Sequence, residues 1–295
     1  MQTSLLLPPR GAGPALMPRP GVWTRFRRHP LARAGGAGLA LLVAFTFLGP
    51  VVYPINPDQP HLGHLLQPPG GGFPLGTDGL GRDELARLMW GGQPALETGF
   101  AAAAVAVVAG TAYGMIAGLA GGVVDAVLMR LVDVVLAVPP LFLLLFLGAV
   151  LRPGVPLLIL ILGAVSWSPV SRLVRAEVLR LKQLPFVEAE YAMGAGPLHM
   201  MRQALLPNLL GVVLVTATFT TADAILAVAV LSFLGLGLPP PAPNWGRMLA
   251  SAMGTMYQHT WWLVYPPGLA ILATELSLTW VGDALRAAFD PRLTP

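Results

Sequence analysis

Residues 98–124 read TGFAAAAVAVVAGTAYGMIAGLAGGVV, a run of 27 residues without Asp, Glu, Lys or Arg. A helix of about 20 mostly apolar residues is long enough to cross the hydrocarbon core of a bilayer. Five further charge-free stretches lie at 34–57, 134–151, 153–171, 203–222 and 248–274. We therefore expect an all-α integral membrane protein with six transmembrane helices, whose cores lie at 34–53, 96–120, 134–151, 155–172, 209–236 and 264–285.

The composition of the whole chain supports a membrane protein. Only 11% of its 295 residues are charged, against about 25% in an average soluble domain. Hydrophobic residues make up 55%, and the mean hydropathy is +0.69. These values exclude a water-soluble enzyme. Because the chain has no cysteine, disulfides, thiolate chemistry and cysteine-bound metals are excluded as well.

The distribution of basic residues predicts the orientation of the chain. With the N-terminus in the cytoplasm, 14 of the 18 Lys and Arg residues fall on the cytoplasmic side. The four on the external side are Arg82, Arg87, Arg152 and Arg247. Since cytoplasmic loops carry the excess of Lys and Arg, both termini are predicted to be cytoplasmic. This topology accounts for the net charge of +4, so we expect membrane lipid around the chain and no nucleic-acid partner.

The composition also suggests how the chain is divided. Residues 1–22 are rich in Pro and Gly and are expected to form a disordered tail. Residues 23–95 would hold the first transmembrane helix and a long external loop, 54–95. No small-x-small cleavage site follows Phe47, so the first helix is expected to be an uncleaved anchor. Residues 96–287 would form a five-helix transmembrane domain, and 288–295 a cytoplasmic tail.

The longest internal cytoplasmic segment, 172–208, has the pattern of two helices joined by a bend. Gly194 or Gly196 can end the first helix in a left-handed conformation, and Pro197 suits the first turn of the second. Leu198, Met201 and Leu205 are expected on one face of that second helix, with His199, Arg202 and Gln203 on the other. Such a helix could lie flat on the lipid interface, or it could dock in a groove of another protein.

This segment resembles the EAA loop of ATP-binding-cassette importer permeases. Glu188 opens the E-A-A element, Gly194 stands at the position of its glycine, and Leu206-Pro207 closes the motif at the expected spacing. Glu190 and Ala204 depart from the family pattern. The second departure removes apolar bulk from the expected docking face.

Further motifs are similar to those of dipeptide, oligopeptide and nickel permeases. They are FPLGTDGLGRD at 73–83, LSFLGLG at 231–237 and the C-terminal segment 282–293. The similarity extends over about 23–293 and is greatest to the second, C-type permease of such systems. It implies the type I importer permease fold. Val228 stands where the family often carries Glu, so a role for that acid is not expected here.

The resemblance also implies what the chain would work with. The expected partners are a second homologous permease, two ABC ATPase subunits and an external solute-binding protein in the bacterial inner membrane. The chain itself has no G-x-x-x-x-G-K-[ST] phosphate loop, so we expect no enzyme activity and no cofactor on it, with ATP and Mg on the ATPase. The expected ATPase-coupling residues are Glu188, Ala189, Glu190, Gly194, Leu198, Met201, Leu205, Leu206 and Pro207. The expected cargo is a small peptide, with nickel or another small solute as the alternative.

Two carboxylates within the apolar spans are candidates for a transport pathway. A charged side chain at the membrane centre costs at least about 2.5 kcal/mol, so it normally faces protein or water. Asp223, which follows Thr220, and Glu275 are therefore expected either to line a pathway or to form helix–helix hydrogen bonds. An ion-coupled secondary transporter that uses these two acids is the alternative from another functional class.

The external loop holds two further groups of polar residues. His61 and His64 lie three residues apart, but with no other ligands nearby we expect plain surface histidines and no metal site. Asp78, Asp83 and Glu84 lie close to Arg82 in sequence. Local pairing within the loop is the first interpretation, and a substrate gate is the second. No pair of residues has catalytic spacing.

Overall fold

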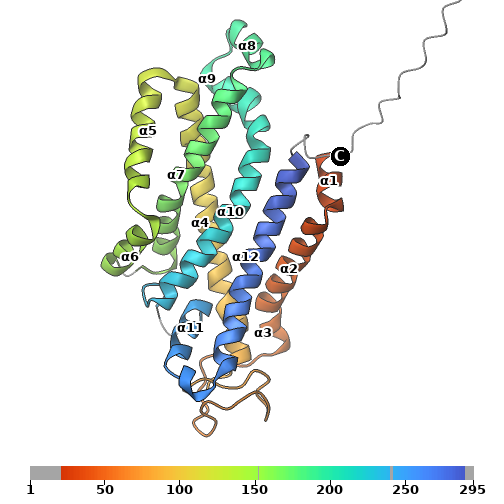
Figure 1. Ribbon diagram of the computed structural model, residues 1–295, viewed down its shortest axis with the longest axis vertical. Helices are drawn as coiled ribbons and strands as arrows, with labels where there is room; N and C mark the ends of the chain where they lie inside the picture. Colours follow the sequence, from red (N-terminus) through yellow and green to blue (C-terminus); the bar gives the residue numbers. More distant parts are fainter. Residues whose placement is uncertain (1–20, 152, 240–241, 290–295) are drawn as a thin grey trace, which may run out of the picture.

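The computed structural model describes residues 21–151, 153–239 and 242–289, and every regular element within them is a helix (Figure 1). The N-terminal helices are α1 (Val22–Arg28), α2 (Pro30–Phe47), α3 (Gly49–Val52) and α4 (Glu84–Ala120). The middle of the chain forms α5 (Gly122–Ala137), α6 (Pro140–Leu151), α7 (Val155–Leu181), α8 (Pro185–Ala192), α9 (Pro197–His199) and the π-helix η1 (Met200–Leu205). The C-terminal helices are α10 (Leu206–Phe233), α11 (Trp245–Met253), the 3-10 helix η2 (Met256–Gln258) and α12 (Trp261–Phe289).

Five of these helical segments are long and apolar enough to cross a membrane. They are Pro30–Phe47, Glu84–Ala120, Val155–Leu181, Pro197–Phe233 and Trp261–Phe289, and the bent pair α5–α6 makes six if it is counted as one span. The predicted all-helical membrane fold is confirmed. The two predicted tails lie almost entirely outside the described residues, since α1 begins at Val22 and α12 ends at Phe289.

The third predicted span, 134–151, is wrong as a single helix. Helix α5 ends at Ala137, and α6 starts at Pro140 after a bend of 76°. Val138 between them is extended, with φ −91° and ψ 124°. The cause is Pro139, because proline restricts the preceding residue to extended conformations and has no N–H to continue the helix.

The loop predicted at 54–95 is shorter than expected. Residues 84–95, expected in the loop, form the first three turns of α4. Asp83 begins this helix by accepting a hydrogen bond from the Ala86 N–H at 2.8 Å, as a favoured N-cap residue does. Pro94 is accommodated inside the helix.

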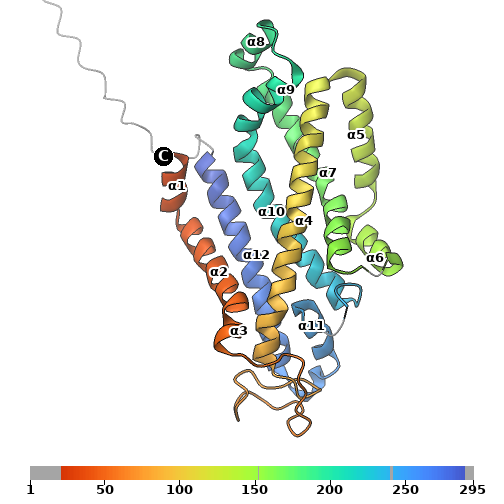
Figure 2. The ribbon, with the colours of Figure 1, turned by 180° about the vertical axis from the view of Figure 1, so that it is seen from behind.

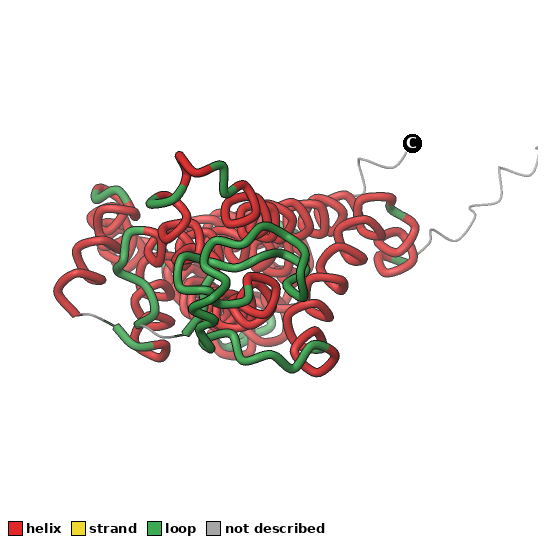
Figure 3. The backbone as a smooth tube through the Cα atoms, turned by 90° about the horizontal axis from the view of Figure 1, so that it is seen from below, coloured by secondary structure: helices red, strands yellow, loops and turns green. Residues whose placement is uncertain are grey.

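Helix α4 runs through the middle of the bundle, between α7 and α10 on one side and α2 and α12 on the other (Figures 1 and 2). The loop between α3 and α4 covers one end of the bundle (Figure 3). Helices α8 and α9 lie at the opposite end, where α1 and the end of α12 also lie (Figure 1).

Helix α5 is held against α7 by charged side chains. The guanidinium of Arg175 donates two hydrogen bonds to the Asp125 carboxylate, at 2.6 and 2.5 Å. Arg172 pairs with Asp133 further along the same two helices. Bidentate Arg–carboxylate pairs hold both distance and orientation, so the first pair positions the bent α5–α6 segment on the bundle.

Candidate functional site

The bend between α8 and α9 has the backbone geometry that its glycines predict. Gly194 has φ +83°, a left-handed conformation that glycine adopts without steric cost. The Ala195 N–H donates to the Glu190 carbonyl at 3.1 Å, and the Gly194 N–H donates to the Tyr191 carbonyl at 3.1 Å. These two bonds form a Schellman cap, which satisfies carbonyls at the end of α8. The prediction that Pro197 starts the next helix is also confirmed.

The bend exposes one part of the predicted coupling set and buries another. Glu188, Ala189, Gly194, Leu198, Leu206 and Pro207 are exposed, whereas Glu190 and Met201 are partly buried. Leu205 is 0% exposed. The prediction that Leu198, Met201 and Leu205 lie on one face is therefore wrong, since Leu198 is 60% exposed. The reason is the π-helix η1, whose wider turns change the angular spacing of side chains.

The buried side of the bend attaches it to the transmembrane helices. Met200 and Ala204 pack with Val187 in one apolar cluster. Leu205 packs in another cluster that includes Val178 of α7. Ala204 thus lies inside the chain, so the expectation that it weakens an outer docking face is wrong. Since these contacts join the bend to α7 and α10, a displacement of the bend would act directly on both helices.

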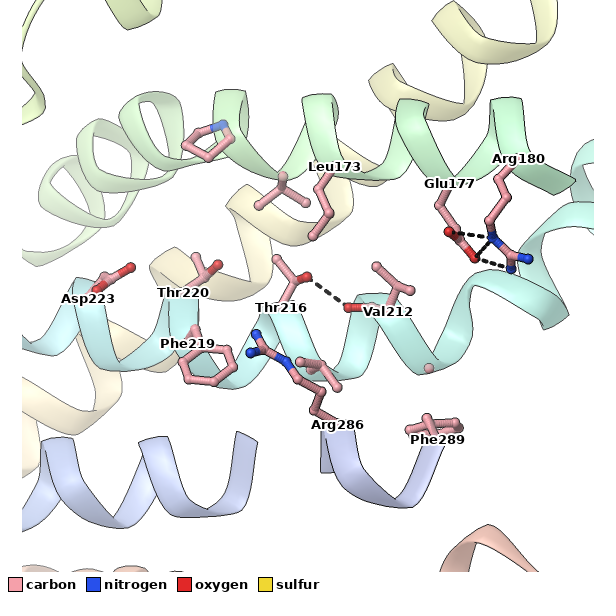
Figure 4. A pocket seen from close by; sticks show the side chains of 14 residues that line it. Leu173, Glu177, Arg180, Val212, Thr216, Phe219, Thr220, Asp223, Arg286 and Phe289 are labelled. Atoms are coloured by element: carbon pink, nitrogen blue, oxygen red, sulfur yellow. Dashed lines mark hydrogen bonds and ion pairs between the residues drawn. The ribbon is translucent and has the colours of Figure 1, made fainter. Parts of the chain in front are cut away.

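A cavity of about 890 Å³ lies between α7, α10 and α12 (Figure 4). Two of the three predicted pathway residues, Thr220 and Asp223 of α10, line it. Glu275, the third, belongs to α12 and is not among the lining residues. It interacts electrostatically with Asp223, and its Oε1 is buried without a hydrogen-bond partner among the described residues. Arg286 and Phe289 also line the cavity, and sequence reasoning missed both.

Comparison with known proteins places these features in one family. The family model "Binding-protein-dependent transport system inner membrane component" matches residues 110–295. The chain belongs to this family. A second model, "N-terminal TM domain of oligopeptide transport permease C", matches residues 20–69. The C-type permease family inferred from the sequence motifs is thereby confirmed.

Curated relatives match the permease over almost its full length. The di/tripeptide transport system permease protein DppC of Pseudomonas aeruginosa (strain UCBPP-PA14) is 38% identical over 277 residues, which are 92% of this chain and 91% of the relative. A putative peptide permease protein of Brucella suis biovar 1 is 38% identical over 265 residues, 88% of this chain and 87% of the relative. The dipeptide transport system permease protein DppC of Bacillus subtilis (strain 168) is 34% identical over 280 residues, 95% of this chain and 88% of the relative. The permease is therefore a multi-pass protein of the bacterial inner membrane.

The loop that covers the far end of the permease is held by local ion pairs. Arg82 donates to the Asp78 carboxylate at 2.8 Å, and Asp83 accepts a hydrogen bond from the Tyr53 hydroxyl at 2.7 Å. Burial and the bond to Asp83 raise the pKa of Tyr53. Local pairing, the first interpretation of this acidic group, is confirmed for Asp78.

Two residues that sequence reasoning did not single out anchor this loop. Arg87, only 3% exposed, reaches from α4 into the loop and donates to the Pro57 carbonyl at 3.1 Å. Trp262 donates to the Thr77 carbonyl at 3.2 Å. The available signal for the first was an Arg four residues after the GRD motif, while nothing local marks the second.

The two loop histidines point to different partners. His61 Nδ1 lies 3.1 Å from the Gly81 carbonyl oxygen, and His64 Nδ1 lies 2.7 Å from Gln67 Oε1. Both rings contact Phe73. Within the part of the chain that the structure describes, no group of three His, Cys, Asp or Glu residues could hold a metal ion.

Proposed function

We propose that this permease forms half of the translocation pathway of an ATP-driven importer for small peptides. Three of its relatives are named as peptide permeases, and this is the support for the cargo class. The polar-ended cavity between α7, α10 and α12 offers space for a solute of that size. Membership of a binding-protein-dependent family favours ATP-driven import over the ion-coupled alternative.

In this proposal the chain hydrolyses nothing itself. A second homologous permease would complete the pathway, two ABC ATPase subunits would carry ATP and Mg, and an external solute-binding protein would deliver the peptide. Both termini and the bend would lie in the cytoplasm, and the loop between α3 and α4 outside. No nucleic acid takes part. The solute would be released inward when ATP turnover shifts the populations of outward- and inward-facing states.

The bend from α8 to η1 would transmit the motion of the ATPase. Its exposed residues, Glu188, Ala189, Gly194, Leu198, Leu206 and Pro207, would contact the ATPase, with Glu190 and Met201 at the edge of the contact. Leu205 would act from the inner side, where it joins the bend to α7. The observation that carries this proposal is the exposed, Schellman-capped bend whose rear face packs on the transmembrane helices.

Paired glycine substitutions test the coupling role of the bend. Gly194→Val forces a β-branched residue into φ +83°, whereas Gly196→Val places the same side chain at φ −73°. A Cβ at either position meets no atom within 4 Å, so the two variants differ in backbone strain. We expect Gly194→Val to abolish most ATP-dependent peptide uptake by the reconstituted importer while the protein still inserts in the membrane, because strain of about 1–3 kcal/mol reshapes the bend.

The matched control should keep its uptake. Gly196→Val is expected to transport at close to the rate of the unmodified protein, because valine adopts φ −73° without strain. Unchanged uptake by Gly194→Val, with normal membrane levels, would refute the coupling role.

A further inference from the structure

The cavity between α7, α10 and α12 carries two opposite charges that the described residues leave unpaired. The Asp223 carboxylate lines one end and makes no hydrogen bond or ion pair among them. The Arg286 guanidinium lies over the ring of Phe219, 5.1 Å from its centre, and has no carboxylate partner among them. Arg180, which also lines the cavity, is different because it already pairs with Glu177 (Figure 4).

The end of the cavity near Asp223 favours a cation. Asp223 acts electrostatically on Glu275 of α12, so a second acidic side chain lies close to this end of the cavity. Glu275 Oε1 is buried and has no hydrogen-bond partner among the described residues. A carboxylate attracts a positive ligand through its charge. A ligand ammonium is the group that matches this end.

The end near Arg286 favours an anion of matching shape. A guanidinium presents its N–H donors in a planar fork that binds a carboxylate through two hydrogen bonds. The contact with Phe219 holds this fork over α10, beside the cavity. The carboxylate of a ligand is therefore the natural partner for this end.

The spacing of the two ends fits a very short peptide. Phe219 precedes Asp223 by four residues of α10, and this corresponds to about 6 Å along the helix axis. An extended dipeptide spans at most about 7 Å. The wall between the ends is formed largely by apolar side chains such as Val170, Leu173 and Val215, which accept varied side chains without specific contacts.

We infer that this cavity is a transit site for zwitterionic dipeptides, which binds their amino terminus beside Asp223 and their carboxylate at Arg286. The inference rests on the proposed function. It adds that the permease recognises a peptide within the membrane by its amino terminus and its carboxylate. Peptides with different side chains would pass because the apolar wall does not discriminate among them.

Two charge-removing variants test the inference in the complete importer, reconstituted with its second permease, ATPases and solute-binding protein. Asp223→Asn and Arg286→Gln keep side-chain size and remove one charge each. We expect each to lower ATP-dependent uptake of an unmodified dipeptide by about tenfold, the loss typical of one charge-assisted hydrogen bond. Asp283→Asn is the control, because Asp283 lies on α12 but outside the cavity lining.

A binding measurement without the solute-binding protein separates recognition from folding. A dipeptide with a photoactivatable side chain should label the unmodified complex, and its N-acetylated and C-amidated forms should label it more weakly. Asp223→Asn should lose the preference for the free amino terminus alone, and Arg286→Gln the preference for the free carboxylate alone. A purely structural role would weaken all three labels equally.

The results that overturn the inference differ from those that overturn the proposed function. Absence of ATP-dependent uptake in the unmodified importer would overturn both. If the unmodified importer takes up dipeptide normally, and the two variants match it in uptake and in labelling, the transit site alone would be overturned. Equal loss of labelling for free and blocked peptides would do the same.

Discussion

At the scale of single residues, a row of glycines decides how closely α4 and α7 approach each other. Gly110, Gly114 and Gly118 are spaced four residues apart on α4, and small residues at this spacing let membrane helices come into close contact. A Cβ at Gly114 would lie 2.4 Å from the Ser171 carbonyl oxygen and 2.9 Å from Val174 Cβ. The helix pair at the centre of the bundle therefore has no room for a side chain there.

Gly114→Leu is accordingly expected to destabilise the permease. Overpacking at a site that cannot move costs about 1–3 kcal/mol and occasionally more. Here the obstacle is the backbone of α7, so we expect a loss of about 3 kcal/mol in the free energy of unfolding. Thermal unfolding of the purified protein in detergent measures the change. Gly36→Leu on α2 is the control, because a Cβ at that position meets nothing within 4 Å, and an equal drop for both variants would contradict the close-packing argument.

At the scale of elements, Arg87 joins the loop between α3 and α4 to the bundle. Its Nη1 lies 3.2 Å from Asp58 Oδ1, and its Nε lies 3.7 Å from Asp78 Oδ2. The side chain of Arg87 is 3% exposed, and that of Asp78 is 10% exposed. Removal of Arg87 would leave Asp58 without this ion-pair partner and Asp78 with Arg82 alone, which makes this residue more important than a member of an exposed ion pair.

We expect Arg87→Met to destabilise the fold and release the loop. Loss of a buried ion-pair partner costs about 3 kcal/mol or more, and the loop should become sensitive to protease added from outside. Limited proteolysis of intact spheroplasts measures this release. Arg172→Gln removes an ion pair whose members are 54% and 52% exposed, so it should change stability by less than about 1 kcal/mol. A protease-resistant loop in Arg87→Met would show that other contacts, such as that of Trp262, hold it.

At the scale of the whole molecule, the two ends of the bundle are chemically distinct. The bend, α1 and the end of α12 lie at one end of the bundle, and the loop between α3 and α4 lies at the other (Figure 1). The basic residues Arg25, Arg27 and Arg28 lie in the last turn of α1. The excess of positive charge at cytoplasmic segments thus predicts that the bend faces the cytoplasm.

Single cysteines test this orientation, and the cysteine-free chain needs no prior substitution. Leu62, 79% exposed in the loop, and Gln183, exposed between α7 and α8, are suitable positions. A membrane-impermeant maleimide should label Leu62→Cys in intact spheroplasts, whereas Gln183→Cys should react only after permeabilisation. The unsubstituted protein gives the background, and the reverse labelling pattern would invert the proposed topology.

The sequence by itself determined the class of fold, most of the membrane spans and the left-handed bend. Each of these depends on local properties. A charge-free run such as 98–124 is stable in hydrocarbon whatever surrounds it, and Gly194 can adopt φ +83° because it has no Cβ. The sequence motifs also indicated the permease family, and the family match confirmed this prediction.

Only the tertiary structure decided which side chains meet. The burial of Leu205 against α7 and the convergence of Asp223 and Arg286 on one cavity depend on helices far apart in the chain. Hydrophobic patterning ranks segments by their preference for lipid, but it does not order helices around one another. That order follows from close packing, such as the fit of α7 against Gly114, and packing is a property of atoms from distant segments brought into contact.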